Sequence, residues 1–322
     1  MKKSLVAATA LLVVLPVSLV LGRGTGSLPG ESGVPINLNT GFPGCGACHN
    51  PFPDFNVTYQ VTSAMSVRPG AAVPITAKTF GANSTSTRGG FSMEATLGTF
   101  VPGTTTRVGT LKNLRSGITH NSSLNRQWTF SLTAPTKPGL VKLFGTGNCA
   151  DGNGHSSGDA WGWHGHDGSV PGTPHRIFVN ATQIFPYGSS CAGEKGYLPV
   201  IGMPANAVIN TSFDTQVHNV PPLTVSLVMM GFSNKLWGAF PLPFDLTALG
   251  APGCSLRASM DVLNPIVTTG SGPSNGVGKA TWALPNIPVL RGFDLYFQAM
   301  TVDASANALG LSLSMGLRAP IQ

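Results

Sequence analysis

Short apolar segments between proline and glycine turns constrain the fold of this 322-residue chain more than any other feature. Gly occurs 41 times and Pro 26 times, and charged residues make up only 10% of the chain, against about 25% in a typical soluble domain. Hydrophobic residues still account for 42%, which is too much for a disordered chain. No convincing helix of more than two turns can be found. The sequence therefore predicts an all-β protein with two β-sandwich domains in tandem.

The first sandwich is expected over residues 56–183. Alternation in the segment that begins at Trp128 puts Trp128, Phe130 and Leu132 on one face, and Pro135 follows the end of that strand because proline cannot donate to a ladder. Turn signals separate the other segments at the spacing of a sandwich. The expected strands are Val57–Thr62, Ala72–Phe80, Phe91–Gly98, Thr106–Leu111, Gln127–Thr133, Leu140–Thr146 and Arg176–Asn180.

A second series of strands predicts another sandwich over residues 187–322. Proline-rich turns such as Pro221-Pro222 separate its segments. This part of the chain holds one His, His218, and no acidic cluster, so we expect no chemistry there. The expected strands are Leu223–Met230, Leu236–Phe240, Ser255–Met260, Ile266–Thr269, Lys279–Leu284, Phe293–Val302 and Leu309–Leu317.

Residues 1–22 resemble a cleavable signal peptide. Lys2 and Lys3 provide a positive start, Leu5–Leu21 is almost uninterrupted apolar sequence, and small residues follow. We expect a secreted, periplasmic or cell-surface protein with no integral membrane segment in the mature chain. An uncleaved N-terminal anchor is the alternative, although the apolar run is marginal for a span of about 20 residues.

The formal charge of +7 is spread along the chain without a basic run, so nucleic acid is not an expected partner. The few acidic residues offer no identifiable pair of carboxylates for glycoside chemistry. No Cys/His dyad can be argued from spacing either. An enzyme is therefore not the favoured function class.

The pentapeptide Cys45-Gly-Ala-Cys-His49 matches the C-x-x-C-H signature of covalent c-type haem attachment. Two thiols at this spacing can add to the two vinyl groups of one haem, and His49 follows where its imidazole can ligate the iron. The sequence predicts haem c at Cys45, Cys48 and His49, on an extended lead-in of residues 23–55. A bare Cys45–Cys48 disulfide or half of a metal site are the alternatives.

A second iron ligand would have to be another His or a Met. His120 lies in the polar segment Gly-Ile-Thr-His-Asn-Ser-Ser, which we expect to be a loop before the Trp128 strand. Met65 and Met93 are further candidates, although either residue could simply fill core space. A solvent-exposed loop histidine is the plain alternative for His120.

The sequence around residue 160 offers two further sets of candidate metal ligands. His164 and His166 alternate with glycine, and in an extended strand their side chains would share one face, as a copper or zinc pair needs. Asp151, Asn153 and Asp159 offer oxygen ligands for Ca²⁺ in a glycine-rich loop, without the spacing of an EF-hand. A glycine-rich aromatic loop that packs over the sandwich is the alternative for both.

Three of the five cysteines lie outside the haem motif. Cys191 and Cys254 share the C-terminal segment and can close a disulfide in an oxidising compartment. Cys149 is then left over. We favour a buried thiol for it, with a bond to another chain or a metal-ligand role as alternatives.

These motifs together resemble a known family. In order they are Cys45-x-x-Cys-His49, Thr119-His120, Trp128-Thr-Phe-x-x-Thr-Ala-Pro135, Gly139-x-Val-x-x-Phe144, Asn148–Gly154 and Gly158-Asp159. Residues 36–180 resemble the choice-of-anchor V domain of exported bacterial proteins, a β-sandwich similar to the Reeler domain. The C-x-x-C-H lead-in and the Thr-His pair occur together in that family, so the resemblance implies a haem or redox role with His120 as the second ligand. Cys149 departs from the family pattern, and the usual C-terminal anchor is not found.

Residues 187–322 are similar to a β module at the ends of many secreted, planctomycete-type proteins. The matching residues are Tyr187-Gly-x-x-Cys191, Gly231-x-Ser, Trp237-Gly, Pro241-Leu-Pro243-x-Asp245-Leu and Gly250-Ala-Pro-Gly-Cys254. The resemblance names no function for this module, but its two cysteines support the Cys191–Cys254 disulfide.

The sequence as a whole favours an exported c-type haem protein for electron transfer or redox sensing. Its partner would be an unidentified redox protein or a component of the cell envelope. A non-enzymatic surface or adhesion protein with a Cys45–Cys48 disulfide is the first alternative. A copper or zinc protein that uses His164, His166 and a further His is the second.

Overall fold

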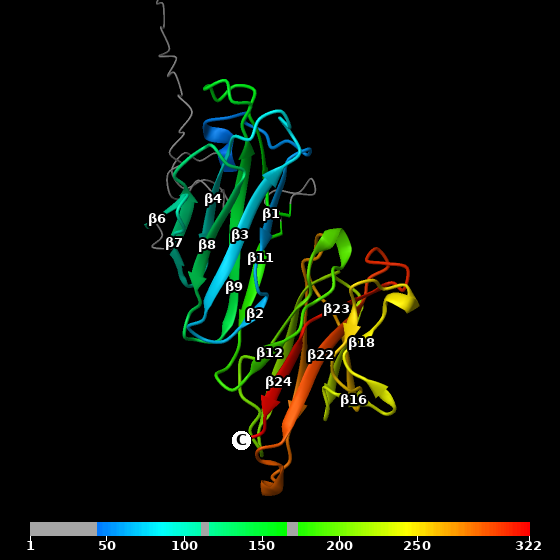
Figure 1. The fold of residues 1–322 in the computed structure, drawn as a ribbon. Coiled ribbons are helices and arrows are strands. Elements are labelled where there is room, and N and C mark those ends of the chain that lie inside the picture. Colours follow the sequence, from blue (N-terminus) through cyan, green and yellow to red (C-terminus); the bar gives the residue numbers. More distant parts are fainter. Residues whose placement is uncertain (1–43, 111–115, 166–172) are drawn as a thin grey trace, which may run out of the picture.

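The computed structural model describes residues 44–110, 116–165 and 173–322, and Figure 1 shows strands joined by turns and loops. The helical elements among them are single short turns, namely η1 (Gly44–Ala47), η2 (Glu194–Gly196), η3 (Thr247–Leu249) and η4 (Pro288–Leu290). The predicted all-β class is confirmed. The predicted signal peptide and most of the lead-in lie outside the described residues. No helix in the described part is long and apolar enough to cross a membrane.

Two facing sheets form the N-terminal half of the chain. The four-stranded sheet has the order β1-β3-β8-β5, and the seven-stranded sheet has the order β2-β11-β9-β4-β7-β6, with β10 paired to β9. Strands β2 and β11 pair in parallel. The bounds are β1 (Thr58–Thr62), β2 (Ser66–Val67), β3 (Ala72–Phe80), β4 (Gly89–Ala95), β5 (Thr99–Val101), β6 (Thr106–Thr110), β7 (Ser116–His120), β8 (Gln127–Thr133), β9 (Gly139–Cys149), β10 (Ala160–Trp163) and β11 (His175–Val179).

The core between these sheets follows from alternation along the strands. Trp128, Phe130 and Leu132 of β8 all point inward and are buried, as the sequence predicts. Phe91 of β4 stacks on Phe130 from the facing sheet, with ring centres 5.5 Å apart. Burial of aromatic side chains of this size supplies a large share of the hydrophobic stabilisation of such a core.

The C-terminal half has its own sheets and its own core. A six-stranded sheet has the order β12-β24-β22-β15-β20, with β23 paired to β22, and a three-stranded sheet has the order β13-β14-β21. The pairs β16–β17 and β18–β19 form two further, two-stranded sheets. The bounds are β12 (Phe185–Tyr187), β13 (Val200–Gly202), β14 (Ser212–Val220), β15 (Val225–Gly231), β16 (Leu236–Trp237), β17 (Phe240–Pro241), β18 (Phe244–Asp245), β19 (Ser255–Leu256), β20 (Val262–Val267), β21 (Gly276–Ala283), β22 (Asp294–Val302), β23 (Leu311–Leu313) and β24 (Gly316–Pro320).

The two halves meet where β13 lies against β11 and β2. Met65, Phe178 and Val200 form a small buried cluster at this contact. Gly202 is required there, because a Cβ atom on it would lie 2.0 Å from the ring of Phe178. The buried Arg176 extends from β11 into the C-terminal half, where Asn219 accepts its hydrogen bond at 2.6 Å. The halves therefore share a packed and polar interface.

Strand predictions failed where pairing rather than local sequence decides the conformation. The segment around His120, expected to be a polar loop, is strand β7, and the side chain of His120 is buried. Thr119 stabilises this pairing by donating its hydroxyl proton to the carbonyl of Phe91 at 2.6 Å. The expected strand Leu236–Phe240 is instead a hairpin formed by β16 and β17. By contrast, β3 and β8 have the predicted bounds.

The predicted Cys191–Cys254 disulfide is confirmed. It lies in a small core of the C-terminal half with Leu246, Ala251 and Leu313. Cys149, at the end of β9, is a fully buried thiol. Burial raises the pKa of this thiol, although the positive charge of Arg126 opposes the shift.

Candidate functional site

The C-x-x-C-H motif forms a tight turn. The carbonyl of Cys45 accepts hydrogen bonds from the backbone N–H groups of Cys48 at 3.2 Å and His49 at 3.1 Å. Cys45 and Cys48 are both half-buried and carry thiols rather than a disulfide. The turn therefore presents two thiols and one imidazole from a single loop of backbone.

The turn packs on the face of the seven-stranded sheet that is directed away from the sandwich core. Gly145 and Gly147 of β9 face Tyr59 in the core, so the alternate residue Thr146 points outward. The Cys45 Sγ lies 3.4 Å from the Thr146 Oγ1. At Gly44, with φ of +51°, a Cβ atom would lie 2.3 Å from the ring of Trp161. Close packing of glycine on tryptophan holds the motif in place.

Trp161 anchors the segment that carries the motif. Its ring is buried, and its Nε1–H donates to the carbonyl of Asn50 at 2.6 Å. The backbone N–H of Asp54 donates to the carbonyl of Trp161 at 2.8 Å. Trp163 meets Trp161 edge to face, with ring centres 4.9 Å apart. Strand β10 thus fixes the segment that follows His49 at Asn50 and Asp54.

His49 faces a buried carboxylate. Its Nδ1 lies 3.1 Å from the Oδ2 of Asp159, although the ring is not aligned for a hydrogen bond. The other oxygen of Asp159 accepts a hydrogen bond from the backbone N–H of Asp151 at 2.9 Å. Metal-ligating histidines commonly have a carboxylate at the nitrogen that does not bind the metal. This arrangement fits His49 as an iron ligand through Nε2.

Asn148 of β9 lies at the Nε2 side of His49. The side-chain amide nitrogen of Asn148 is 3.4 Å from the His49 Nε2. The amide oxygen of Asn148 is buried and has no hydrogen-bond partner among the described residues. An unsatisfied buried oxygen is costly. The Nε2 of His49 therefore has the amide group of Asn148 as its polar neighbour, and that amide is only partly satisfied.

His120 lies near the contact between Asn148 and His49. Gly90 is directly opposite Asn148 in the β4–β9 pair, and a Cβ atom on Gly90 would lie 2.4 Å from the His120 Cε1. The backbone N–H of Phe91 lies 3.0 Å from the His120 Nδ1, and the carbonyl of Phe91 lies 3.1 Å from the same atom. His120 therefore lies beside Gly90, whose cross-strand partner Asn148 contacts His49 on the turn. The His120 ring also packs against Phe91 and Trp128, with ring centres 6.3 and 6.0 Å away.

The other residues predicted as metal ligands do not come together at one site in the described part of the chain. Met65 and Met93 are buried in the hydrophobic clusters. Asp151 accepts hydrogen bonds from the backbone and side chain of Asn153 at 2.9 and 2.7 Å, so its oxygens serve the loop itself. Asp159, considered above for Ca²⁺, faces His49. Among residues 44–110, 116–165 and 173–322, no three His, Cys, Asp or Glu side chains are grouped to hold a metal ion.

His166 lies outside the described residues, and the structure pairs His164 with His175 instead. The centres of the two rings are 5.6 Å apart. Burial lowers the pKa of His164 to about 4, and burial together with the neighbouring His164 lowers the pKa of His175 to about 3. Both imidazoles are therefore neutral at physiological pH.

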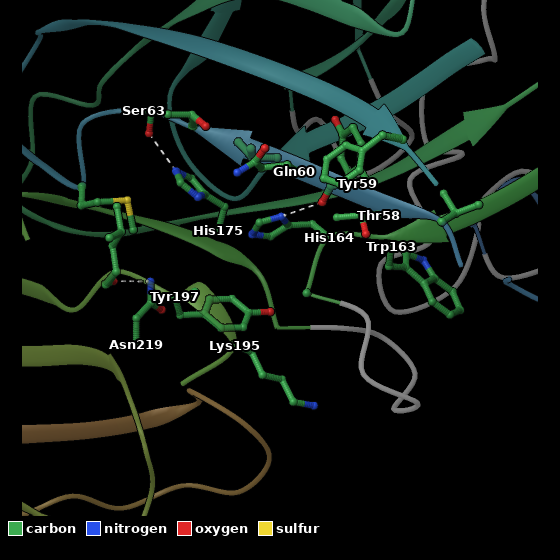
Figure 2. A pocket seen from close by; sticks show the side chains of 18 of the residues that line it. Thr58, Tyr59, Gln60, Ser63, Trp163, His164, His175, Lys195, Tyr197 and Asn219 are labelled. Atoms are coloured by element: carbon green, nitrogen blue, oxygen red, sulfur yellow. Dashed lines mark hydrogen bonds between the residues drawn. The ribbon is translucent and has the colours of Figure 1, made fainter. Parts of the chain in front are cut away.

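These two histidines line a cleft of about 530 Å³ between the two halves of the chain, which Figure 2 shows from close by. The N-terminal half contributes strand β1 and the residues around His164 and His175, and the C-terminal half contributes the loop that follows η2. The polar and aromatic residues that line it include Tyr59, Gln60, Ser63, Trp163, Lys195, Tyr197 and Asn219.

The segment Gly154-His-Ser-Ser-Gly158 fits the G-x-S-x-G pattern of hydrolase nucleophiles. That motif requires a sharp turn from a strand into a helix. Here the residues form an irregular, mostly exposed loop between β9 and β10. The pattern therefore lacks the structural context that gives it catalytic meaning.

Sequence reasoning missed the residues that complete these sites. Asp159 and Asn148 contact His49, Gly90 makes room for His120, and His175 faces His164. No local signal marks these partners, because strand pairing and the β9–β10 turn bring them together.

No protein-family model matches the chain. A search of curated proteins finds no match either.

Proposed function

We propose that the protein is an exported c-type haem protein that transfers or senses electrons outside the cytoplasm. Cys45 and Cys48 would form the two thioether bonds, and the His49 Nε2 would bind the iron. The observation that carries the proposal is the position of His49, whose Nδ1 faces the buried carboxylate of Asp159. The confirmed disulfide supports an oxidising compartment.

The residues around the motif would have different roles in holding haem. A small rotation of the His49 ring would let Nδ1–H donate to Asp159, 3.1 Å away, and would leave Nε2 as the basic nitrogen. Trp161 and Asn50 keep the turn on the sheet. Bound haem would supply one-electron exchange at a potential set by its ligands and surroundings. The role of the β-sandwich is to hold these groups in a fixed arrangement.

The resemblance to choice-of-anchor V domains and the position of His120 support it as the second iron ligand. A proton on the His120 Nδ1 can be donated to the carbonyl of Phe91, 3.1 Å away, which leaves Nε2 basic. The backbone N–H of Phe91 favours the opposite tautomer. Iron binding at Nε2 would select the tautomer with the proton on Nδ1.

The chemical test of the proposal is covalent attachment. Full-length protein produced in a host with haem c maturation is expected to retain its Soret absorption after extraction with acidified acetone, because thioether bonds survive that treatment. Intact mass should increase by one haem. A protein without the added mass, with Cys45 and Cys48 joined in a disulfide, would contradict the proposal.

Replacement of His120 by Ala should change the spin state of the haem rather than its attachment. Loss of a sixth ligand is expected to convert a six-coordinate, low-spin absorption spectrum into a high-spin one, at unchanged haem content. His155→Ala is the matched control, since His155 lies exposed in the β9–β10 loop. An unchanged spectrum in the His120 variant would assign the sixth position to another residue.

A surface-binding function is the alternative. The C-terminal half exposes apolar side chains near the β16–β17 hairpin, with Phe232 65%, Leu236 56% and Phe240 52% exposed. Clusters of this kind often mark interaction sites. Under this alternative, Cys45 and Cys48 form a disulfide and the protein adheres to other components of the envelope.

A further inference from the structure

We propose that His164 and His175 form a binding site for a divalent transition-metal ion, copper(II) above all, in the cleft between the two halves of the chain. This site is separate from the C-x-x-C-H motif and does not depend on haem. It also differs from the predicted pair of His164 with His166.

The tautomer of His164 follows from its hydrogen bond. The His164 Nδ1 lies 3.1 Å from the backbone carbonyl oxygen of Tyr59, and a carbonyl can only accept, so the proton is on Nδ1. The other ring nitrogen, Nε2, therefore has a bare lone pair. This atom is buried, and no hydrogen-bond partner for it exists among the described residues. A histidine oriented by a carbonyl at one nitrogen is typical of metal ligands.

The tautomer of His175 follows by the same reasoning. The hydroxyl of Ser63 donates its proton to the carbonyl of Ala64 at 3.1 Å. The Ser63 Oγ must therefore accept the bond from the His175 Nε2 at 2.8 Å. The proton of His175 is then on Nε2, and its Nδ1 has the lone pair. Each ring thus offers one nitrogen as a ligand.

The separation of the rings suits a shared ion. Two imidazoles that bind one metal with nitrogen–metal distances of about 2.0–2.1 Å have ring centres about 5–6 Å apart. The observed separation is 5.6 Å, with an angle of 73° between the ring planes. Figure 2 shows the two rings side by side at the wall of the cleft, held by Ser63 and Tyr59. Little rearrangement is needed to bring both lone pairs to one ion.

The chemistry of the ligands points to copper. Imidazole nitrogen binds copper, zinc and nickel, and affinity is highest for Cu²⁺ in the order of divalent metals. The remaining positions would be open to water or a small ligand, because the described residues add no third His, Cys, Asp or Glu. Lys195 lines the same cleft, and Arg176 lies close enough to affect His164. Two cations favour an anionic co-ligand.

The test is titration of the full-length, haem-loaded protein with Cu²⁺, followed by calorimetry and by the copper signal in electron paramagnetic resonance. We expect one equivalent of Cu²⁺ with nitrogen hyperfine structure. His164→Ala and His175→Ala should each weaken binding more than about tenfold, and His155→Ala should leave it unchanged. The circular dichroism spectrum of each variant checks its fold. If an alanine variant unfolds, His164→Gln and His175→Gln take its place.

Two outcomes would overturn the proposal. Binding that survives in both the His164 and the His175 variants would place the copper elsewhere. Binding that is lost in His166→Ala but retained in His175→Ala would assign the ion to the pair predicted from sequence. Haem content is measured in the same samples, so a failure of haem attachment is recorded separately from a failure to bind copper.

Discussion

Replacing both motif cysteines, Cys45→Ser and Cys48→Ser, is expected to abolish covalent haem attachment while leaving the fold unchanged. Serine hydroxyls do not form thioether bonds, and the two side chains are only half-buried and lie outside the sandwich core. Denatured protein should lose all haem absorption, whereas the wild type retains it. The circular dichroism of the two proteins should be the same.

Cys149→Ala is the matched control for this variant. Cys149 is a thiol of the same half, but it is fully buried and belongs to no haem motif. Its replacement should leave haem content at the wild-type level. Covalent haem in the Cys45/Cys48 double variant would show that other residues hold the cofactor, and it would contradict the assignment of the motif.

Removal of the disulfide, as Cys191→Ala with Cys254→Ala, should lower the free energy of unfolding of the C-terminal half by about 4 kcal/mol. This value is the loop-closure entropy expected for a cross-link between cysteines 63 residues apart. Local packing adds to it, because the backbone N–H of Leu313 donates to the Cys191 Sγ at 3.2 Å. Denaturant unfolding followed by circular dichroism measures the difference.

Reduced and alkylated protein provides a check on the disulfide prediction without any substitution. It should show the same direction of change, while the Cys149→Ala variant keeps its disulfide and its C-terminal stability. A loss below about 1 kcal/mol in the double variant would mean that the unfolded chain is already restricted around residues 191–254.

Alternation along the chain was enough to predict the all-β fold and the strands with the clearest pattern. Trp128, Phe130 and Leu132 carry this signal themselves, because burial of every second residue is a local property. Strand β7 does not. It has one large apolar residue, Ile118, between polar residues and glycine, and it exists because β4 and β6 pair with it on both sides. Long-range pairing of this kind cannot be found in the local sequence.

In the candidate site too, some residues can be identified from local sequence, and others are placed only by long-range strand pairing. Cys45, Cys48 and His49 could be identified because their spacing along the chain is itself the chemical requirement. The sequence marks Asp159 as an oxygen donor but does not indicate its partner. Its position beside His49 depends on the turn between β9 and β10. The pairing of His164 with His175 likewise follows from the register of β10 and β11 against β9.

The docking of η1 on Trp161 has a consequence for the order of maturation. Once Gly44 is seated on the tryptophan ring, both thiols are half-covered and less open to a large planar molecule. If haem is attached as proposed, attachment would have to precede the final closure of the turn. Sandwiches dominated by non-local pairing fold in milliseconds to seconds. Under the proposed function, this interval would be the time available for a haem-attaching enzyme to act on the open turn.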